Sequence, residues 1–479
     1  MIITISIIGL LISGSLAWFF EGIKANSARW IAIYAVFGFF VFFVTSIISS
    51  PLNFNELTLL TRLPWIDSFH IEYAIALDYL SITLILLTFF LAMICILVSW
   101  QEITDKKGFY YFNLLATFAG IIGVFSATDL FLFFFFWEVM LLPMTALIAI
   151  WGHENRYFAA IKFFIFTQVS SLLMLVAIIA MAYFHYSQMG EVSFFYQDWL
   201  SLNVPIEISR YIMLGFFIAF AVKLPSFPVH SWLPDAHTQA PTAGSVLLAG
   251  VLLKTGAYGL IRFVIFLFPQ AAAEFAPIAS LLGVISILYG AKMAFAQTDF
   301  KRLVAYSSIS HMGFVMLALF SFTTIAYQGA IITLVAHGLS SAALFSMAGM
   351  IYSRLHTRDL DKMGGLWSSA PRMGGFALAF AAAAFGLPGL ANFVGEFLSL
   401  VGAYQVFPVT VIIASFGLVG SAIYGMVLFQ RCFQGPASED IADLSARELV
   451  ISASLLTLLI IFGLYPNFLL SYFIPLGAL

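Results

Sequence analysis

The chain has 479 residues, of which 62% are hydrophobic and only 9% are charged, with a formal net charge of −3. So few charges over this length exclude a soluble globular protein, and apolar runs that are continuous rather than alternating exclude a membrane β-barrel. Since each span needs about 20 apolar residues, the sequence predicts an all-α polytopic membrane protein with about fourteen transmembrane helices.

The predicted spans follow one another along the whole chain, which we expect to form a single membrane domain over residues 1–479. They begin near Met1, Trp30, Asp78, Phe109, Leu130, Ile161, Arg210, Thr242, Phe275, Leu303, Tyr327, Met373, Val409 and Leu449. No basic segment precedes the apolar N-terminus, so we expect a retained first span and no cleaved leader. Residues 1–107 are predicted to hold three helices, with Asp78 capping the third, and residues 447–479 a C-terminal helix.

Lysine and arginine are distributed unevenly between the two sides of the predicted bundle. The loops and helix ends of one side hold Lys24, Arg29, Lys106, Lys107, Arg156, Lys162, Lys301, Arg302, Arg354, Arg358, Lys362, Arg372, Arg431 and Arg447. Those of the other side hold Arg62, Arg210 and Arg262. Because loops rich in these residues stay in the cytoplasm, we expect the first set to be cytoplasmic and both termini to lie on the outer side of a bacterial inner membrane.

The fifth span contains an isolated acid, Glu138, with no polar neighbour within one helical turn. In hydrocarbon a lone carboxylate protonates or finds a cation, and we expect Lys223 to be that cation. The alternative is an acid that only ties two helices together. The sixth span adds the polar side chains Thr167, Gln168, Ser170 and Ser171. Such groups are typical of interhelical hydrogen bonds, and they could also hold water along a path.

A proline-rich interruption divides one hydrophobic span near the middle of the chain. Lys223 precedes the interruption and Lys254 follows it, both in apolar surroundings. The polar and helix-breaking residues between them include Pro225, His230, Asp235 and His237. Because Pro opens the helical hydrogen-bond ladder and a charge at mid-membrane costs roughly 2.5–3.5 kcal/mol on insertion scales, we expect a broken helix with a functional buried lysine. The alternative is a snorkelling lysine, or a kink that only shapes the packing.

The second half of the chain repeats this pattern. Gly386, Pro388 and Gly389 interrupt another hydrophobic span, and Glu396 follows two turns later. If residues 108–268 and 274–434 form two groups of five spans, the interrupted span is the fourth in each. An odd number of spans places two copies in opposite orientations, which is typical of inverted-repeat transporters with an ion path along the broken helices.

Two histidines, His311 and His337, lie deep in predicted spans of the second half. Either could be a core residue with satisfied hydrogen bonds, but imidazole titrates near neutrality. With Lys254 and Glu396 they form a series of titratable groups on successive spans, as a proton path requires. A metal site is not expected, because no Cys or carboxylate stands beside them at ligand spacing. Lys292 is assigned no role.

Several of these strings resemble a known family. They are the run from Phe216 to Thr255, together with Phe135–Glu138, Ala296–Asp299, Lys301-Arg302 and Asn392–Phe397. They are similar to the antiporter-like subunits of respiratory complex I and of Mrp-type cation/proton antiporters. Within that family the NuoM type is the most similar, since Glu396 stands where the relatives often have lysine. The sequence also ends without the long C-terminal extension of the NuoL type.

The resemblance implies a proton-translocating subunit of NADH:quinone oxidoreductase with no redox chemistry of its own. The proton-transfer residues that it marks are Glu138, Lys223, Lys254, His311, His337 and Glu396. Glu138 and Lys223 would form a charged pair in the first half-channel, and their separation would drive a proton towards Lys254. Glu396 would end the second half-channel.

The resemblance also implies partners and cofactors. No cofactor or metal would be bound by this chain, because the sequence has no phosphate-binding loop, iron–sulfur cysteine cluster or dinucleotide fingerprint. NADH, FMN, iron–sulfur clusters and quinone would belong to partner subunits. The membrane neighbours would be NuoL-type and NuoN-type subunits and small membrane subunits, with no nucleic acid. Two alternatives stay open: an Mrp-type Na⁺(K⁺)/H⁺ antiporter subunit that works without a redox partner, and a structural spacer that tolerates substitution of every titratable residue named above.

Overall fold

The computed structural model describes residues 1–23, 26–50, 52–436 and 439–473. Within these residues the chain is mostly helical, and eleven helices are long and apolar enough to cross a membrane. The predicted polytopic helical fold is therefore confirmed, while the count of fourteen spans stays a prediction. Lys24 and the predicted end of the C-terminal segment, 474–479, lie outside the described residues.

The chain packs as two compact units. The first contains residues 1–96, 103–224 and 251–275, and the second contains residues 97–102, 225–250 and 276–479. This division follows packing, and the repeats over 108–268 and 274–434 stay a prediction.

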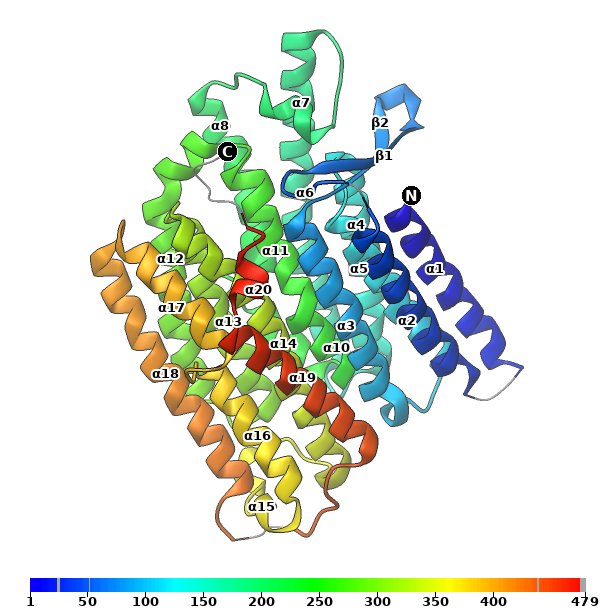
Figure 1. Cartoon of the computed structure of the whole chain (residues 1–479), viewed down its shortest axis with the longest axis vertical. Coiled ribbons are helices and arrows are strands. Elements are labelled where there is room, and N and C mark those ends of the chain that lie inside the picture. Colours follow the sequence, from blue (N-terminus) through cyan, green and yellow to red (C-terminus); the bar gives the residue numbers. More distant parts are fainter. Residues whose placement is uncertain (24–25, 51, 437–438, 474–479) are drawn as a thin grey trace. The chain divides into compact units, whose positions relative to one another are not determined.

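The first unit consists mainly of helices. They are α1 (Ile2–Glu21), α2 (Ser27–Ile48), most of α3 (Tyr79–Glu102), α4 (Lys107–Val124), α5 (Leu130–Trp151), α6 (Arg156–Met189), the short α7 (Tyr196–Leu200), α8 (Ile206–Lys223) and α11 (Leu253–Gly259). Helix α1 lies alongside both α2 and α4, and α5 packs between α4 and α6 (Figure 1). Asp78 caps α3 as predicted, because its Oδ1 accepts a hydrogen bond from Ser81 N at 2.9 Å.

A β-hairpin between α2 and α3 was not predicted. Strand β1 (Thr58–Ile66) pairs antiparallel with β2 (Ile71–Leu77) through the turn η1 (Asp67–Phe69). Arg62 Nε donates to Glu72 Oε2 at 2.5 Å across the two strands. Glu72 is thus paired with a cation of the neighbouring strand. The sequence hid the hairpin because two short strands give a weak signal between long apolar spans.

The second unit contains most of the C-terminal helices. They are α9 (Trp232–Gln239), α10 (Thr242–Leu247), most of α12 (Pro269–Phe295), α13 (Phe300–Leu319), α14 (Thr324–Leu355), η4 (Leu360–Lys362), α15 (Leu366–Ser369), α16 (Pro371–Ala384), α17 (Ala391–Tyr404), α18 (Pro408–Phe433), α19 (Ala446–Leu464) and α20 (Asn467–Leu470). Helix α14 lies along α13 and α17, and α18 packs against α16 and α17. Almost every residue of α13 and most residues of α14 are buried, so these two helices form the centre of the unit.

Both predicted helix breaks are present. Helix α8 ends at Lys223 and the helical path resumes at Trp232. Helix α16 ends at Ala384 and α17 begins at Ala391. In the second break Gly386 and Gly389 have φ angles of 75° and 98°, a backbone region that glycine enters without steric cost. The local residues therefore account for where these helices stop.

Candidate functional site

Lys223 ends α8 at the edge of the first break. Its side chain is buried, and Nζ lies 5.3 Å from the ring centroid of Trp137 and 5.4 Å from that of Phe163. Among the described residues Nζ has no hydrogen-bond partner. Aromatic faces attract a cation when it is desolvated, so the ammonium is held by rings instead of by fixed acceptors.

Glu138 on α5 is half-buried and is held from α6. Its Oε1 accepts a hydrogen bond from Ser171 Oγ at 2.7 Å. The negative charge of Glu138 acts on Lys223, although the two side chains form no direct hydrogen bond. The predicted pair is thus close enough to interact electrostatically. Ser171 is one of the polar residues noted in the predicted sixth span, and in the structure it is the one that binds Glu138.

Asp129 anchors the start of the helix that carries Glu138. It is buried just before α5, where its carboxylate accepts hydrogen bonds from Leu132 N at 2.9 Å and from Glu72 N at 3.0 Å. Burial raises the pKa of Asp129 to about 6, and the hydrogen bonds offset only part of this effect. The β-hairpin and the N-terminus of α5 are therefore joined at one buried carboxyl group.

Lys254 lies on α11 and is fully buried in the structure. Two π-helical segments flank this helix, η2 (Leu248–Leu252) and η3 (Leu260–Ile265). Such segments are rare and occur frequently at functional sites. Gly256 lets α11 approach α8 closely, because a Cβ atom there would lie 2.7 Å from Leu224 N. The backbone beside Lys223 and the helix of Lys254 are consequently in direct contact.

The second broken helix carries a hydrogen-bonded pair. Glu396 on α17 and His311 on α13 are both buried, and His311 Nδ1 lies 2.6 Å from Glu396 Oε1. The ring of His337 on α14 has its centroid 5.5 Å from that of His311. The three residues that were predicted from separate spans therefore form one cluster.

The other oxygen of Glu396 lies towards the break. A Cβ atom built at Gly386 would lie 3.3 Å from Glu396 Oε2. This oxygen has no hydrogen-bond partner among the described residues. One carboxylate oxygen is thus bound to His311, and the other approaches the non-helical backbone between α16 and α17.

Tyr424 is a member of this cluster that the sequence interpretation missed. Its hydroxyl, on α18, lies 3.3 Å from His311 Nε2, so His311 has a neighbour at each ring nitrogen. A signal was present, because a tyrosine inside an apolar span usually needs a hydrogen-bond partner. The identity of that partner depends on the packing of α18 against α13.

In the first break, two histidines contact aromatic rings and one aspartate forms an ion pair. The ring of His230 lies 4.9 Å from that of Tyr289, and the ring of His237 stacks on Phe345 at 4.6 Å. Asp235 pairs with Arg302 at 3.1 Å. Pro225 follows α8 directly, and Pro388 lies exposed in the second break.

Basic side chains hold the C-terminal end of α9, and this arrangement was also missed. Lys301 is buried and donates to the carbonyl of Ala240 at 2.8 Å. Arg358 donates to the carbonyl of Thr238 at 2.5 Å. The last carbonyls of a helix are unpaired within it and carry partial negative charge. These two cations therefore fix the half-helix that follows the first break.

The described residues contain no group of three or more His, Cys, Asp or Glu that could hold a metal ion. Cys95 and Cys432 are both buried, and neither forms a disulfide with a described residue. The exposed Lys292 on α12 lies outside all the clusters described above.

Proteins of similar sequence indicate the family of the chain. The family model for NADH:quinone oxidoreductase and Mrp antiporter transmembrane subunits matches residues 127–423. NADH-quinone oxidoreductase subunit M of Pseudomonas aeruginosa is 50% identical over 471 residues, covering 95% of this chain and 92% of that protein. The subunit M of Escherichia coli K12 is 52% identical over 415 residues, covering 85% and 82%.

Solved structures give the same result. A chain of respiratory complex I from Thermus thermophilus matches with a TM-score of 0.89 and 30% identity, covering 98% of both chains. A chain of the Mrp complex from Dietzia matches with a TM-score of 0.85 and 22% identity, covering 98% of this chain and 51% of that one, which shows the fold alone. The chain therefore belongs to the family of NADH:quinone oxidoreductase and Mrp antiporter transmembrane subunits.

Proposed function

We propose that the chain is a proton-translocating membrane subunit of NADH:quinone oxidoreductase, in which protons move through two half-channels in response to redox chemistry in other subunits. The observation that carries the proposal is a buried ionisable group beside each of two helix breaks, Lys223 and Glu396. Ionisable groups inside a membrane are costly and mark ion pathways. The identity with the subunit M relatives supports this class of complex.

In the first half-channel, Glu138 and Lys223 act as an electrostatic switch. Each charge stabilises the other while the two side chains are close. Because no direct hydrogen bond fixes Lys223 Nζ to a described residue, a small movement of α5 or α8 changes this stabilisation. When the pair separates, the ammonium loses its counter-charge and passes its proton towards Lys254. The contact between α8 and α11 supports proton transfer from Lys223 towards Lys254.

In the second half-channel, His311 relays protons to Glu396. A histidine accepts a proton at one ring nitrogen and releases one from the other. Glu396 at Nδ1 and Tyr424 at Nε2 provide neighbours on both sides. His337 supplies a second imidazole beside the first. Glu396 then ends the path, with its second oxygen at the break.

The redox cofactors NADH, FMN, iron–sulfur clusters and quinone belong to partner subunits in this proposal. The membrane neighbours are NuoL-type and NuoN-type subunits together with small membrane subunits. The uneven distribution of Lys and Arg supports a bacterial inner membrane in which both termini lie on the outer side. The predicted repeats, 108–268 and 274–434, each supply one half-channel.

The test is a mild-detergent purification through a tag on this chain. We expect NADH oxidation and the signals of flavin and iron–sulfur clusters to co-purify with it. If other multispan proteins co-purify without these signals, and the sample exchanges Na⁺ for protons, the chain is an antiporter subunit and the proposal is wrong.

A further inference from the structure

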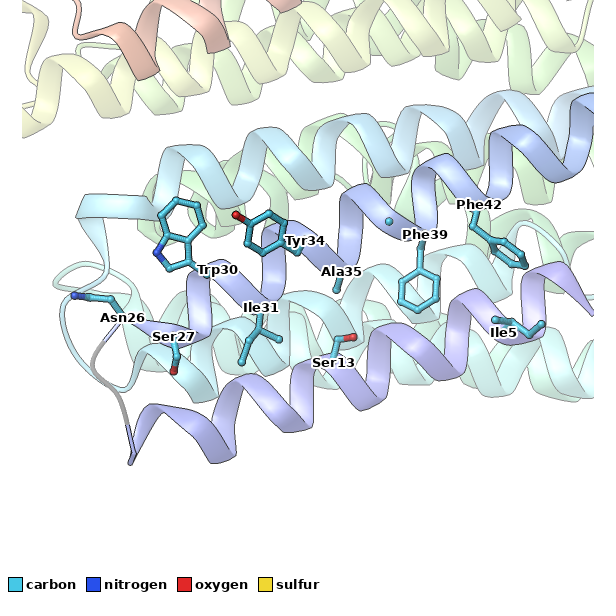
Figure 2. A pocket seen from close by; sticks show the side chains of 11 residues that line it. Ile5, Ser13, Asn26, Ser27, Trp30, Ile31, Tyr34, Ala35, Phe39 and Phe42 are labelled. Carbon is cyan, nitrogen blue, oxygen red and sulfur yellow. The ribbon is translucent and has the colours of Figure 1, made fainter.

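A groove between α1 and α2 lies away from the titratable residues described above. Its volume is about 1160 Å³. Figure 2 shows Asn26 and Ser27 at one end of it and Ile5 and Phe42 at the other. The groove is thus polar at one end and largely apolar along its length.

The sequence of α2 explains why the groove is open. Its buried positions carry mainly small side chains, Ala28, Ala32 and Val36, so one face of the helix can pack closely against its neighbours. Ala35 and Gly38 line the groove. A Cβ atom built at Gly38 would meet nothing within 4 Å. Small residues therefore leave a channel that larger side chains would fill.

Aromatic rings mark the polar end of the groove. Trp30 and Tyr34 lie one turn apart on α2 and line it with stacked rings whose centroids are 5.8 Å apart. Both side chains are exposed. Trp and Tyr are enriched at the level of lipid headgroups. The polar end of the groove therefore matches the membrane interface, and its apolar length matches acyl chains.

A basic side chain lies at the same end. Lys107 Nζ donates to Asn26 Oδ1 at 3.1 Å, which places its ammonium at the groove. Arg29 stands in the first turn of α2, and Lys106 directly precedes α4. The nearby acid Glu21 is bound by Gly108 N at 2.6 Å. Lys107 therefore supplies a cation at this end that suits an anionic headgroup.

We propose that this groove binds one anionic phospholipid, with its phosphate near Asn26, Ser27 and Lys107 and its acyl chains along Ile31, Phe39 and Phe42. Basic pockets between transmembrane helices on the cytoplasmic side bind anionic headgroups. The bound lipid ties α1 and α2 to the rest of the first unit. This site is independent of proton translocation, so it can fail while the proposed function stands.

The experiment uses the full complex in vesicles that contain either phosphatidylglycerol or phosphatidylcholine with a photoreactive acyl chain. Cross-linked peptides are identified by mass spectrometry. We expect the phosphatidylglycerol probe to label α2 in preference to the phosphatidylcholine probe. Lys107→Gln is expected to reduce that preference roughly fivefold, the effect of one basic residue near an anionic headgroup.

Two glycine variants provide the matched test of the groove. Gly38→Phe fills the groove and is expected to abolish labelling of α2. Gly375→Phe, at a glycine of α16 that also has open space around it, is expected to leave that labelling unchanged. NADH oxidation by each complex checks assembly, and Lys107→Gln tests the site without adding bulk. Equal labelling by both probes, or cross-links only to a partner protein, would overturn the proposal.

Discussion

At the first break Lys223 faces two aromatic rings and has no hydrogen bond to a described residue, whereas beyond the second break Glu396 is bound to His311 at 2.6 Å. The two helices are interrupted in similar ways, but their charges are held differently. A charge held by rings and by a half-buried acid responds to small movements. A charge held by a short hydrogen bond keeps its position. The first arrangement suits a switch and the second a fixed relay.

Substitution of Lys223 is the test of this contrast for which we expect the largest effect. Lys223→Met is expected to lower NADH-driven proton translocation by on the order of a hundredfold, a typical effect of losing a positioned proton-transfer group. Stability should change little, because methionine removes a buried ammonium without a fixed acceptor among the described residues, and the half-buried Glu138 keeps its hydrogen bond from Ser171. Proton uptake by inverted vesicles measures the first effect, and thermal unfolding of the purified complex the second.

Lys292→Met is the control for this substitution, since Lys292 is exposed on α12. We expect it to translocate protons at the rate of the unmodified complex. Undiminished proton translocation by Lys223→Met would contradict the switch.

Removing the acid of the second break should lower local stability more than removing the lysine does. Glu396→Ala leaves His311 without its carboxylate and is expected to lower the local unfolding free energy of α17 by about 1–3 kcal/mol. Glu396→Gln should cost less, because its amide oxygen can still accept a hydrogen bond. Hydrogen exchange of peptides from α13 and α17 measures the change.

A double-mutant cycle with His311→Ala isolates the pair from the individual side chains. The exposed Glu154→Ala, in the turn before α6, serves as the control. If hydrogen exchange of α17 is the same with and without Glu396, the hydrogen bond does not fix this helix and the contrast between the breaks is lost.

Ser171 sharpens the description of the first region. Ser171→Ala removes the hydroxyl that binds Glu138 and is expected to destabilise the contact between α5 and α6 by about 1 kcal/mol. Hydrogen exchange of the two helices reports the loss. Ser170→Ala is a matched control, because the Ser170 hydroxyl bonds to Thr167 O within its own helix. Equal effects of the two substitutions would exclude a special role for Ser171.

The smallest effect concerns the buried anchor of α5. Burial raises the pKa of Asp129 from its ordinary value of 3.8 to about 6, so the folded state binds the proton more tightly than the unfolded chain does. This contribution to stability is therefore present at low pH and is lost as pH rises through about 6. Between about pH 5 and about pH 7 the loss amounts to about 1 kcal/mol.

Thermal unfolding of the unmodified complex and of Asp129→Asn measures this dependence. As pH rises, the unmodified complex should lose stability relative to Asp129→Asn, because asparagine does not titrate. Asp67→Asn, at an exposed position in the hairpin turn, should follow the unmodified complex at every pH. A parallel pH dependence of the unmodified complex and Asp129→Asn would show that another group is responsible.

The sequence by itself determined the membrane class, the positions of the long helices and both helix breaks. These features depend on local composition, because a span is a continuous apolar run and a break needs only Pro or Gly at one place. It also marked Glu138, Lys223, Lys254 and Glu396, since an ionisable residue in an apolar run is conspicuous without any structure.

Tertiary structure alone decided which groups meet. Glu396 binds His311 from 85 positions away, and Tyr424 reaches His311 from 113. Lys301 binds the end of α9 from 61 positions away. The hairpin that helps to bind Asp129 was likewise not evident. Hydropathy and helix-breaking residues act over one or two turns of a helix. A hydrogen-bond partner, in contrast, depends on which helices pack together. The apolar surfaces of these helices are too alike for the pattern of residues in the sequence to indicate that packing.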